Sequence, residues 1–183
     1  MHKDSVLGSI TLLLLSPVAF TADNLGTPTE QVGNDADVAV TVAVKGALVE
    51  SGIAKTGEVQ VETHERVVQL SGFVDSESTQ ELALQAARAV NGVESVRNDL
   101  VVRTSKPTLT ERKDDTVIAA RVRKQLQQQT EVRSSNDINV DVSEGLVQLS
   151  GFVDSVDKKN RAADIVASVT GVKDVRNDIA LER

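Results

Sequence analysis

The side chains that could do chemistry are few in this sequence, and none has the partners that a reactive site requires. The chain contains two histidines and no Cys, Trp or Tyr, so a thiolate nucleophile, a disulfide and a thiol-rich metal site are all excluded. Apart from His2, the only histidine is His64, and a catalytic or metal-binding histidine needs further ligands or a triad. We therefore expect His64 to be a solvated turn residue, and we predict no catalytic, cofactor-binding or metal-binding residue.

Two aspartates could suggest acid–base catalysis, but their positions favour a structural role. Asp75 and Asp154 each stand just ahead of an expected helix, where an oxygen acceptor satisfies free backbone N–H groups. Catalysis by carboxyl groups would need a second carboxylate at a defined distance in one cleft, and no spacing in the sequence specifies one. We predict that each aspartate and the serine after it cap a helix, with a capping box at Ser78 and Glu81 one turn later, and that the protein is not an enzyme.

Basic side chains are concentrated at two places, both in the second half of the chain. The formal net charge of the whole chain is −7, and this excludes nucleic acid as a general partner because phosphate binding needs a concentrated basic face. A smaller basic patch can still approach anionic phospholipid headgroups, at about 1 kcal/mol for each basic residue near the surface. The candidate contacts for a lipid or another partner are Arg121, Arg123, Lys124, Lys158, Lys159 and Arg161. The alternative interpretation of the same residues is two solvated helix faces.

Residues 1–22 have the pattern of a secretory signal peptide. A basic residue precedes a short apolar run, and small residues follow it. The run is too short to span a bilayer, so we predict no transmembrane span in the mature chain. Cleavage is predicted after Ala22, with cleavage after Thr21 as the alternative. We place the mature protein in a bacterial periplasm, with residues 23–34 as a flexible N-terminal segment.

An internal repeat sets the architecture of the remaining chain. Residues 68–76 read Val-Gln-Leu-Ser-Gly-Phe-Val-Asp-Ser, and residues 147–155 repeat them letter for letter. The string Gly-Val-x-x-Val-Arg-Asn-Asp starts at Gly92 and again at Gly171, at the same separation. The repeating unit is therefore a whole small domain and is too long for a solenoid element.

The two copies occupy residues 35–103 and 114–183. The segment between them, residues 104–113, contains Pro107 and no apolar periodicity, so it is predicted to be a linker. The first copy has 6 basic and 11 acidic side chains, and the second has 10 and 12. Because the first copy is the more acidic, an electrostatic contact with lipid is expected in the second.

Each copy shows the same succession of periodic patterns. Apolar residues at helical spacing, such as Val40, Val44 and Leu48, mark one face of a helix. Alternating apolar and polar residues then predict two strands, and a second helix follows, which a glycine at Gly92 or Gly171 ends before the last strand. The predicted fold class is α+β, with two tandem α-β-β-α-β domains, each a three-stranded sheet with two helices on one face.

Three features that the two copies share can each be interpreted in two ways. Gly72 and Gly151 could allow either a β-bulge or a close contact with a helix. Phe73 and Phe152 could lie partly in the core, which is favoured, or at the surface, where they would contact lipid or client proteins. For the Arg-Asn-Asp string, a turn role with local backbone bonds is favoured over a binding role.

These motifs together resemble the BON domain family. The string Leu-Ser-Gly-x-Val is followed by a helix and then by Gly-Val-x-x-Val-x-Asn-Asp-Leu, and the resemblance covers both copies. It implies a periplasmic protein of the osmotic or envelope stress response that protects envelope components or client proteins by chaperone-like surface contacts. It also implies an alternative, a phospholipid- or envelope-binding adaptor, which the basic residues assign mainly to the second domain. The expected partners are phospholipid headgroups or unfolded outer-membrane proteins, and we expect a monomer without a cofactor.

Overall fold

The structure is a computed structural model that describes residues 29–53, 59–129 and 138–182. The predicted signal peptide, its cleavage site and residues 23–28 lie outside the described residues. The first domain contains α1 (Thr29–Glu50), β1 (Val59–His64), β2 (Val67–Val74), α2 (Glu77–Arg88) and β3 (Ser95–Val102).

The second domain repeats this order with one change at its end. It contains α3 (Leu109–Gln128), β4 (Ile138–Ser143), β5 (Leu146–Val153), α5 (Val156–Ala167), β6 (Asp174–Asn177) and β7 (Ala180–Leu181). The predicted last strand is therefore split in two, and a hydrogen bond of 2.8 Å from the Asp178 N–H to the Leu149 carbonyl continues the pairing at the break. The predicted fold class and the α-β-β-α-β order of both copies are confirmed.

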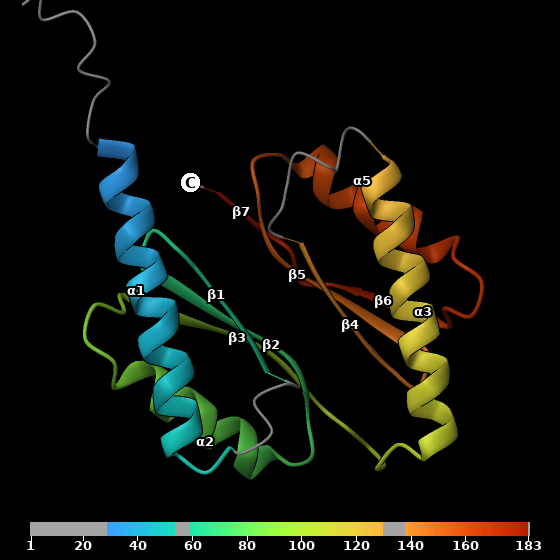
Figure 1. The fold of residues 1–183 in the computed structure, drawn as a ribbon, viewed down its shortest axis with the longest axis horizontal. Coiled ribbons are helices and arrows are strands. Elements are labelled where there is room, and N and C mark those ends of the chain that lie inside the picture. Colours follow the sequence, from blue (N-terminus) through green and yellow to red (C-terminus); the bar gives the residue numbers. More distant parts are fainter. Residues whose placement is uncertain (1–28, 54–58, 130–137, 183) are drawn as a thin grey trace, which may run out of the picture.

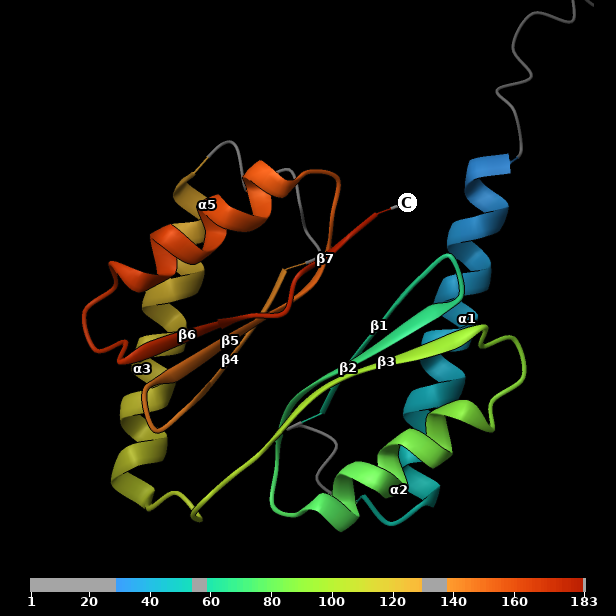
Figure 2. The same cartoon turned by 180° about the vertical axis from the view of Figure 1, so that it is seen from behind.

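The two domains form four layers, with the helices outside and the two sheets facing each other. In the first sheet β2 lies between β1, which is antiparallel to it, and β3, which is parallel. The second sheet has the same order with β5 at its centre. Figure 1 and its reverse view in Figure 2 show α1 and α2 on one outer side and α3 and α5 on the other. Each sheet therefore has one face toward its helices and one face toward the other sheet.

The alternation along the central strands decides which side chains enter the two apolar cores. On β2, Val68 and Leu70 are completely buried against α1 and α2, and Val147 and Leu149 occupy the same positions on β5. Their neighbours of opposite parity point to the other sheet, because successive strand residues alternate between faces. Both cores are aliphatic, built from Val, Leu, Ile and Ala.

The helix caps differ from the prediction in one respect. The N-caps of α2 and α5 are Ser76 and Ser155, whose hydroxyls accept hydrogen bonds from the backbone three residues on. The aspartates before them are not caps but ion-pair partners: Asp75 binds Arg103 at 3.1 Å, and Asp154 binds the Lys158 ammonium at 2.7 Å. The hydrogen bond from Lys158 lowers the pKa of the exposed Asp154 carboxyl. Serine is the better placed residue because it immediately precedes the first helical turn.

Two helices begin earlier than predicted. Residues 109–113 of the predicted linker, residues 104–113, belong to α3. The helix begins there because Thr108 and Glu111 form a capping box at its N-terminus. The hydrogen bonds from the Thr108 backbone and hydroxyl lower the pKa of Glu111. Helix α1 likewise includes residues 29–34, which were predicted to be part of a flexible segment. Periodicity reveals only the part of a helix that packs on a core, so it misses turns that extend beyond it.

An aspartate on the first helix of each domain holds the turn of the following β-hairpin. Asp37 accepts hydrogen bonds of 2.8 and 2.9 Å from the N–H groups of Glu65 and Arg66. Asp115 does the same for residues 144 and 145, at 2.9 and 3.0 Å. This fixes each helix to its sheet at a point that apolar periodicity does not reveal.

Candidate functional site

A buried polar contact joins the two sheets, and we call it the seam. It consists of the same four residue types from each domain. These are Gln69, Ser71, Gly72 and Asp99 of the first domain and Gln148, Ser150, Gly151 and Asp178 of the second. The equivalent residues are 79 positions apart, so the seam has an approximate two-fold symmetry within one chain.

The two glutamines make the central hydrogen bonds of the seam, and each is only 1% exposed. The carbonyl of Gln148 accepts a hydrogen bond of 2.9 Å from the Gly72 N–H, and the carbonyl of Gln69 accepts one of 2.8 Å from the Gly151 N–H. Both glycines have a positive φ, 109° and 118°, a conformation that other residues rarely adopt. The glycines therefore serve the contact between domains, rather than the bulge or helix contact that the sequence suggested.

The glutamine amides complete the pattern on the carboxyl side. The Gln69 amide donates to the Asp99 carboxylate at 2.7 Å and to the Asp178 backbone carbonyl at 2.8 Å. The Gln148 amide donates to the Asp178 carboxylate at 2.7 Å and to the Asp99 backbone carbonyl. At the centre, the hydroxyls of residues 71 and 150 lie 2.7 Å apart. Buried polar groups are stabilising only when they are paired, and here both amides and both carboxylates are.

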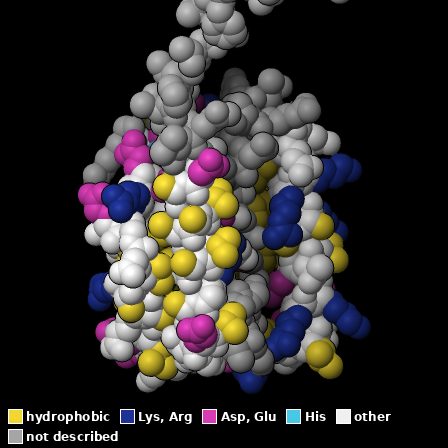
Figure 3. Space-filling view, turned by 60° about the vertical axis from the view of Figure 1, so that its left-hand side comes forward, with side chains coloured by type: hydrophobic (Ala, Val, Ile, Leu, Met, Phe, Trp, Pro, Cys, Tyr) yellow, Lys and Arg dark blue, Asp and Glu magenta, His cyan; other side chains and the backbone are white. Residues whose placement is uncertain are grey.

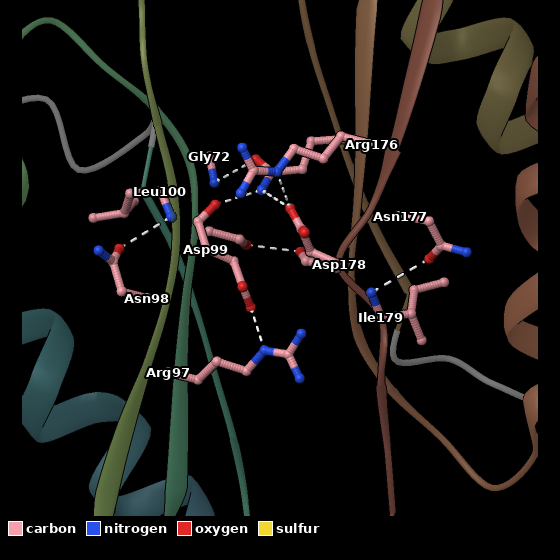
Figure 4. A network of polar contacts seen from close by, with 12 residues as sticks. Gly72, Arg97, Asn98, Asp99, Leu100, Arg176, Asn177, Asp178 and Ile179 are labelled. Carbon is pink, nitrogen blue, oxygen red and sulfur yellow. Dashed lines mark hydrogen bonds and ion pairs between the residues drawn. The ribbon is translucent and has the colours of Figure 1, made fainter.

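The residues of the Arg-Asn-Asp string have two different roles, one in a turn and one in the seam. The Asn98 and Asn177 side chains accept hydrogen bonds from the backbone two residues on, at 3.2 and 3.4 Å. The favoured turn role is therefore correct for the asparagines, but the aspartates belong to the seam. Figure 4 shows Asp99 and Asp178 between the sheets, whereas the asparagines point outward. Arg97 forms an ion pair with the Asp99 carboxylate at 2.6 Å, and the second domain has the equivalent ion pair at 2.7 Å.

Strands β1 and β4 add a second symmetric pair of contacts beside the seam. The Asn139 amide donates to the Glu62 carboxylate at 2.9 Å, and at the equivalent positions Gln60 hydrogen-bonds to Asp141. Burial raises the pKa of the Asp141 carboxyl, and the nearby Arg123 and the hydrogen bond from Gln60 only partly oppose this. One oxygen of Asp141 is buried without a hydrogen-bond partner, so this contact is the less favourable of the two.

The phenylalanines lie at the two ends of the contact between sheets. Phe73 and Phe152 are 4% and 7% exposed, and both lie outside the two apolar core clusters of the described residues. Phe152 packs on His64 with ring centroids 5.2 Å apart, while Phe73 lines a cavity of about 320 Å³ together with Ser143, the equivalent of His64. The phenylalanines are buried, as predicted, but they are buried between the two sheets and not in the apolar cores. His64 is half-buried in the contact and is not a solvated turn residue.

The structure gives most of the predicted basic contact residues a local partner. The Arg121 and Arg123 guanidiniums donate to backbone carbonyls at 3.2 and 2.7 Å, and Lys159 donates to the Ile179 carbonyl at 2.7 Å. Lys158 forms the ion pair with Asp154, and Arg161 also has an interaction partner. Lys124 is exposed on α3 three residues after Arg121. The structure thus distributes the six residues over two separate helices.

The outer face of α1 carries a different kind of surface, which the sequence analysis did not single out. Val38, Val42 and Val49 are 60%, 65% and 57% exposed, and their spacing places them on one side of the helix. Only Lys45 interrupts this apolar stripe. Figure 3 looks onto this side and shows hydrophobic side chains gathered along the helix. The stripe extends for about 16 Å at the helical rise.

A family model described as "BON domain" matches residues 36–104 and 114–183. The chain belongs to the BON domain family. Each match spans one of the two α-β-β-α-β units, so the seam is a contact between two BON domains of one chain.

The chain is similar to known proteins to different degrees. The chain is 38% identical over 151 residues to the osmotically-inducible protein Y of Escherichia coli (strain K12), a match that covers 81% of this chain and 75% of the relative. Two solved structures of CdsD, titled a structural protein of the type III secretion system of Chlamydia trachomatis, match at 15% and 13% identity with TM-scores of 0.33 and 0.28. Those matches cover 73% and 84% of this chain but only 64% and 63% of the CdsD chains.

In the described parts of the two BON domains, no helix combines the length and the apolar composition needed to cross a membrane. Within the same ranges, no three His, Asp or Glu side chains are grouped so that they could hold a metal ion.

Sequence reasoning missed the two glutamines of the seam, although a signal was present. Gln69 and Gln148 stand between valine and leucine on the most apolar strands of the chain, where a polar residue is unexpected unless it has a buried partner. Their retention in both copies pointed to a shared contact. The sequence did not show that the contact was with the other copy.

Proposed function

We propose that the protein acts by binding in the bacterial periplasm, where it protects unfolded client proteins during osmotic stress. The observation that carries the proposal is the apolar stripe on the outer face of α1. The similarity to an osmotically-inducible protein supports the stress role, and the pattern of residues 1–22 supports export. No catalytic step is part of the proposal.

The stripe has the properties of a client-binding surface. Exposed apolar side chains that gather on one helix face, instead of being scattered singly, are typical of interaction sites. Asp35 and Glu50 flank the stripe and are exposed, and the domain around it has more acidic than basic side chains. We therefore infer that it accepts apolar segments flanked by lysine or arginine. An anionic membrane surface is a poor match, because interfacial helices carry basic residues beside their apolar face.

The test is an aggregation assay with a chemically unfolded outer-membrane β-barrel protein as the client. In the variant Val38→Thr/Val42→Ala/Val49→Gln, we expect the concentration for half-maximal protection to rise about tenfold, because each substitution removes apolar area from the contact. The matched control removes three exposed apolar side chains from other helices, in Leu109→Thr/Val117→Thr/Val156→Thr, which are 79%, 48% and 52% exposed. Equal loss of protection in both variants would contradict a role for α1 in particular.

The inferred client chemistry has its own measurement. The probes are two peptides with the same apolar segment. One peptide has a pair of lysines at each end of this segment, and the other has a pair of glutamates at each end. Fluorescence anisotropy with the purified chain should give the lysine peptide the lower Kd, with a difference that shrinks as salt is added. If the two peptides bind equally, charge selection is wrong although apolar binding stands; if neither binds, the proposed function is wrong.

We also propose a second function, binding to anionic phospholipid, which is favoured by two exposed basic residues on one face of α3. Arg121 and Lys124 lie on one helix face, and this surface lies on the opposite outer side of the molecule from α1 (Figure 1). Lys158 and Lys159 on α5 are only partly exposed, and their ammonium groups are bound to a carboxylate and a carbonyl at 2.7 Å, whereas the hydrogen bond of Arg121 is longer, at 3.2 Å. We therefore propose α3 as the main lipid contact and α5 as a minor one.

Cosedimentation with vesicles that contain anionic lipid separates these two contacts. Arg121→Glu/Lys124→Glu should weaken binding more than tenfold, since each basic residue near the surface contributes about 1 kcal/mol. Lys158→Glu/Lys159→Glu/Arg161→Glu is the matched comparison and should have the smaller effect. Binding that neither variant changes, or that salt does not weaken, would contradict an electrostatic lipid contact.

A further inference from the structure

We propose that the seam is an internal homodimer interface, so that a second copy of this chain can occupy the inner sheet face of either domain. The inner face of each domain presents the same glutamine, serine, glycine and aspartate in the same register. An interface whose two sides are the same surface is isologous, which is the property of two-fold symmetric dimers. Here the two sides belong to one chain.

The hydrogen-bond pattern is what makes the face self-complementary. Each glutamine carbonyl accepts from the glycine of the other domain, and each glutamine amide donates to a backbone carbonyl of that domain. Each face therefore offers both a donor set and the matching acceptor set. If the face of one domain were replaced by a copy of the other, every central hydrogen bond would find an identical partner.

The contacts beside the seam are self-complementary in the same way. An amide residue on one first strand meets a carboxylate residue on the other, as Gln60 does with Asp141 and Asn139 with Glu62. Two copies of the first domain would pair Gln60 with Glu62, again an amide with a carboxylate. The phenylalanine of one domain would still meet the hairpin end of its partner.

The connection between the domains decides which arrangement dominates. The β3 strand ends at Val102 and α3 begins at Leu109, and a short connection of this kind gives the two faces an effective concentration on the order of millimolar. A closed monomer is thus favoured in dilute solution. Refolding at high concentration lets two chains exchange domains across two seams, because no new contact is needed.

Single cysteines at the centre of the seam report the exchange, since the hydroxyls of Ser71 and Ser150 lie 2.7 Å apart. Full-length Ser71→Cys and Ser150→Cys chains are mixed, unfolded, refolded at about 1 mM and oxidised. In a closed monomer each cysteine faces a serine, so a disulfide between the two chains requires exchange. The control Thr116→Cys, exposed on α3, measures cross-linking by random collision.

We expect the mixture to yield roughly half of the chains as a disulfide-linked heterodimer, with little in the control. The Ser71→Cys chain alone should also yield homodimers, because the first-domain face pairs with itself. Heterodimers no more abundant than the control, in protein with native circular dichroism, would overturn the exchange. Heterodimers without homodimers would overturn the equivalence of the two faces.

A second measurement does not depend on cysteine. Deleting residues 104–106 leaves three residues between β3 and α3. We expect this connection to be too short for closure and the shortened chain to be a dimer at micromolar concentration by light scattering. A chain with three residues inserted after Ser105 is the control and should remain a monomer. A shortened chain that is folded and monomeric would overturn the proposal.

Discussion

The first helices of the two domains, α1 and α3, are equivalent on one side and unlike on the other. Toward the sheet, Val44 and Leu48 of α1 correspond to Val122 and Leu126 of α3, and all four are buried. Toward solvent, the three exposed valines of α1 correspond to Thr116, Ala120 and Gln127 of α3. Helix α3 instead carries Arg121 and Lys124 on its exposed surface.

This difference shows where the two copies were free to diverge. The inner helix faces and the seam must fit a partner surface within the chain, and a change there costs packing or buried hydrogen bonds. The outer helix faces have no such partner, so substitutions there cost little stability. We therefore assign the fold to what the domains share and the binding functions to what they do not.

The largest expected effect tests whether the core-facing sides of α1 and α3 are equivalent. Leu48→Ala and Leu126→Ala should each lower the free energy of unfolding by about 2–5 kcal/mol, because both remove a buried side chain from a packed core. Urea denaturation followed by circular dichroism measures both. A large loss for only one of them would show that the two cores are not equivalent.

The next effect concerns the seam. Gln69→Ala and Gln148→Ala should each cost about 2–4 kcal/mol, since each leaves a glycine N–H and a backbone carbonyl without the glutamine partner and leaves a buried carboxylate with only its arginine. The two losses should be equal because the contacts are symmetric. Gln80→Ala, which removes a hydrogen bond to the Leu100 carbonyl within the first domain, is the control for loss of a hydrogen bond outside the seam and should cost less.

A smaller effect on stability, with a large effect on binding, is expected when the outer face is transferred. Thr116→Val/Ala120→Val/Gln127→Val places the apolar stripe on α3. Stability should change by less than about 0.5 kcal/mol per substitution, as is usual for surface positions, while protection of an unfolded client increases. If protection does not increase, an apolar helix face is not sufficient for client binding.

The smallest effect is a pH dependence at the contact between β1 and β4. Because burial raises the pKa of Asp141, the folded state holds this proton more tightly than the unfolded state. Its contribution to the free energy of unfolding therefore grows as the pH falls from 7 through the raised pKa. Asp141→Asn should make the protein at least as stable at pH 7, and the difference from the parent chain should shrink as the pH falls toward 4. Glu62→Gln, at the equivalent position, is the control, and a pH-independent loss of stability in Asp141→Asn would contradict the prediction.

The sequence by itself determined the repeated unit and most of its elements. Helical spacing of Val40, Val44 and Leu48 and the alternation along the strands are local patterns, and each follows from which side chains one sheet and its helices must bury. The absence of cysteine limited the chemistry in the same direct way. The start of α3 was missed, because the capping box at Thr108 and Glu111 lies in a segment without apolar periodicity.

Only the tertiary structure decided what the shared letters are for. Gln69, Gly72 and Asp99 recur in the second copy, and each of them makes a hydrogen bond with the other domain, more than 40 residues away. The same holds for Phe73, whose burial was predictable but not its place between the sheets. A repeat shows that two segments share a requirement, and the packing of the two sheets shows that each segment meets that requirement in the other.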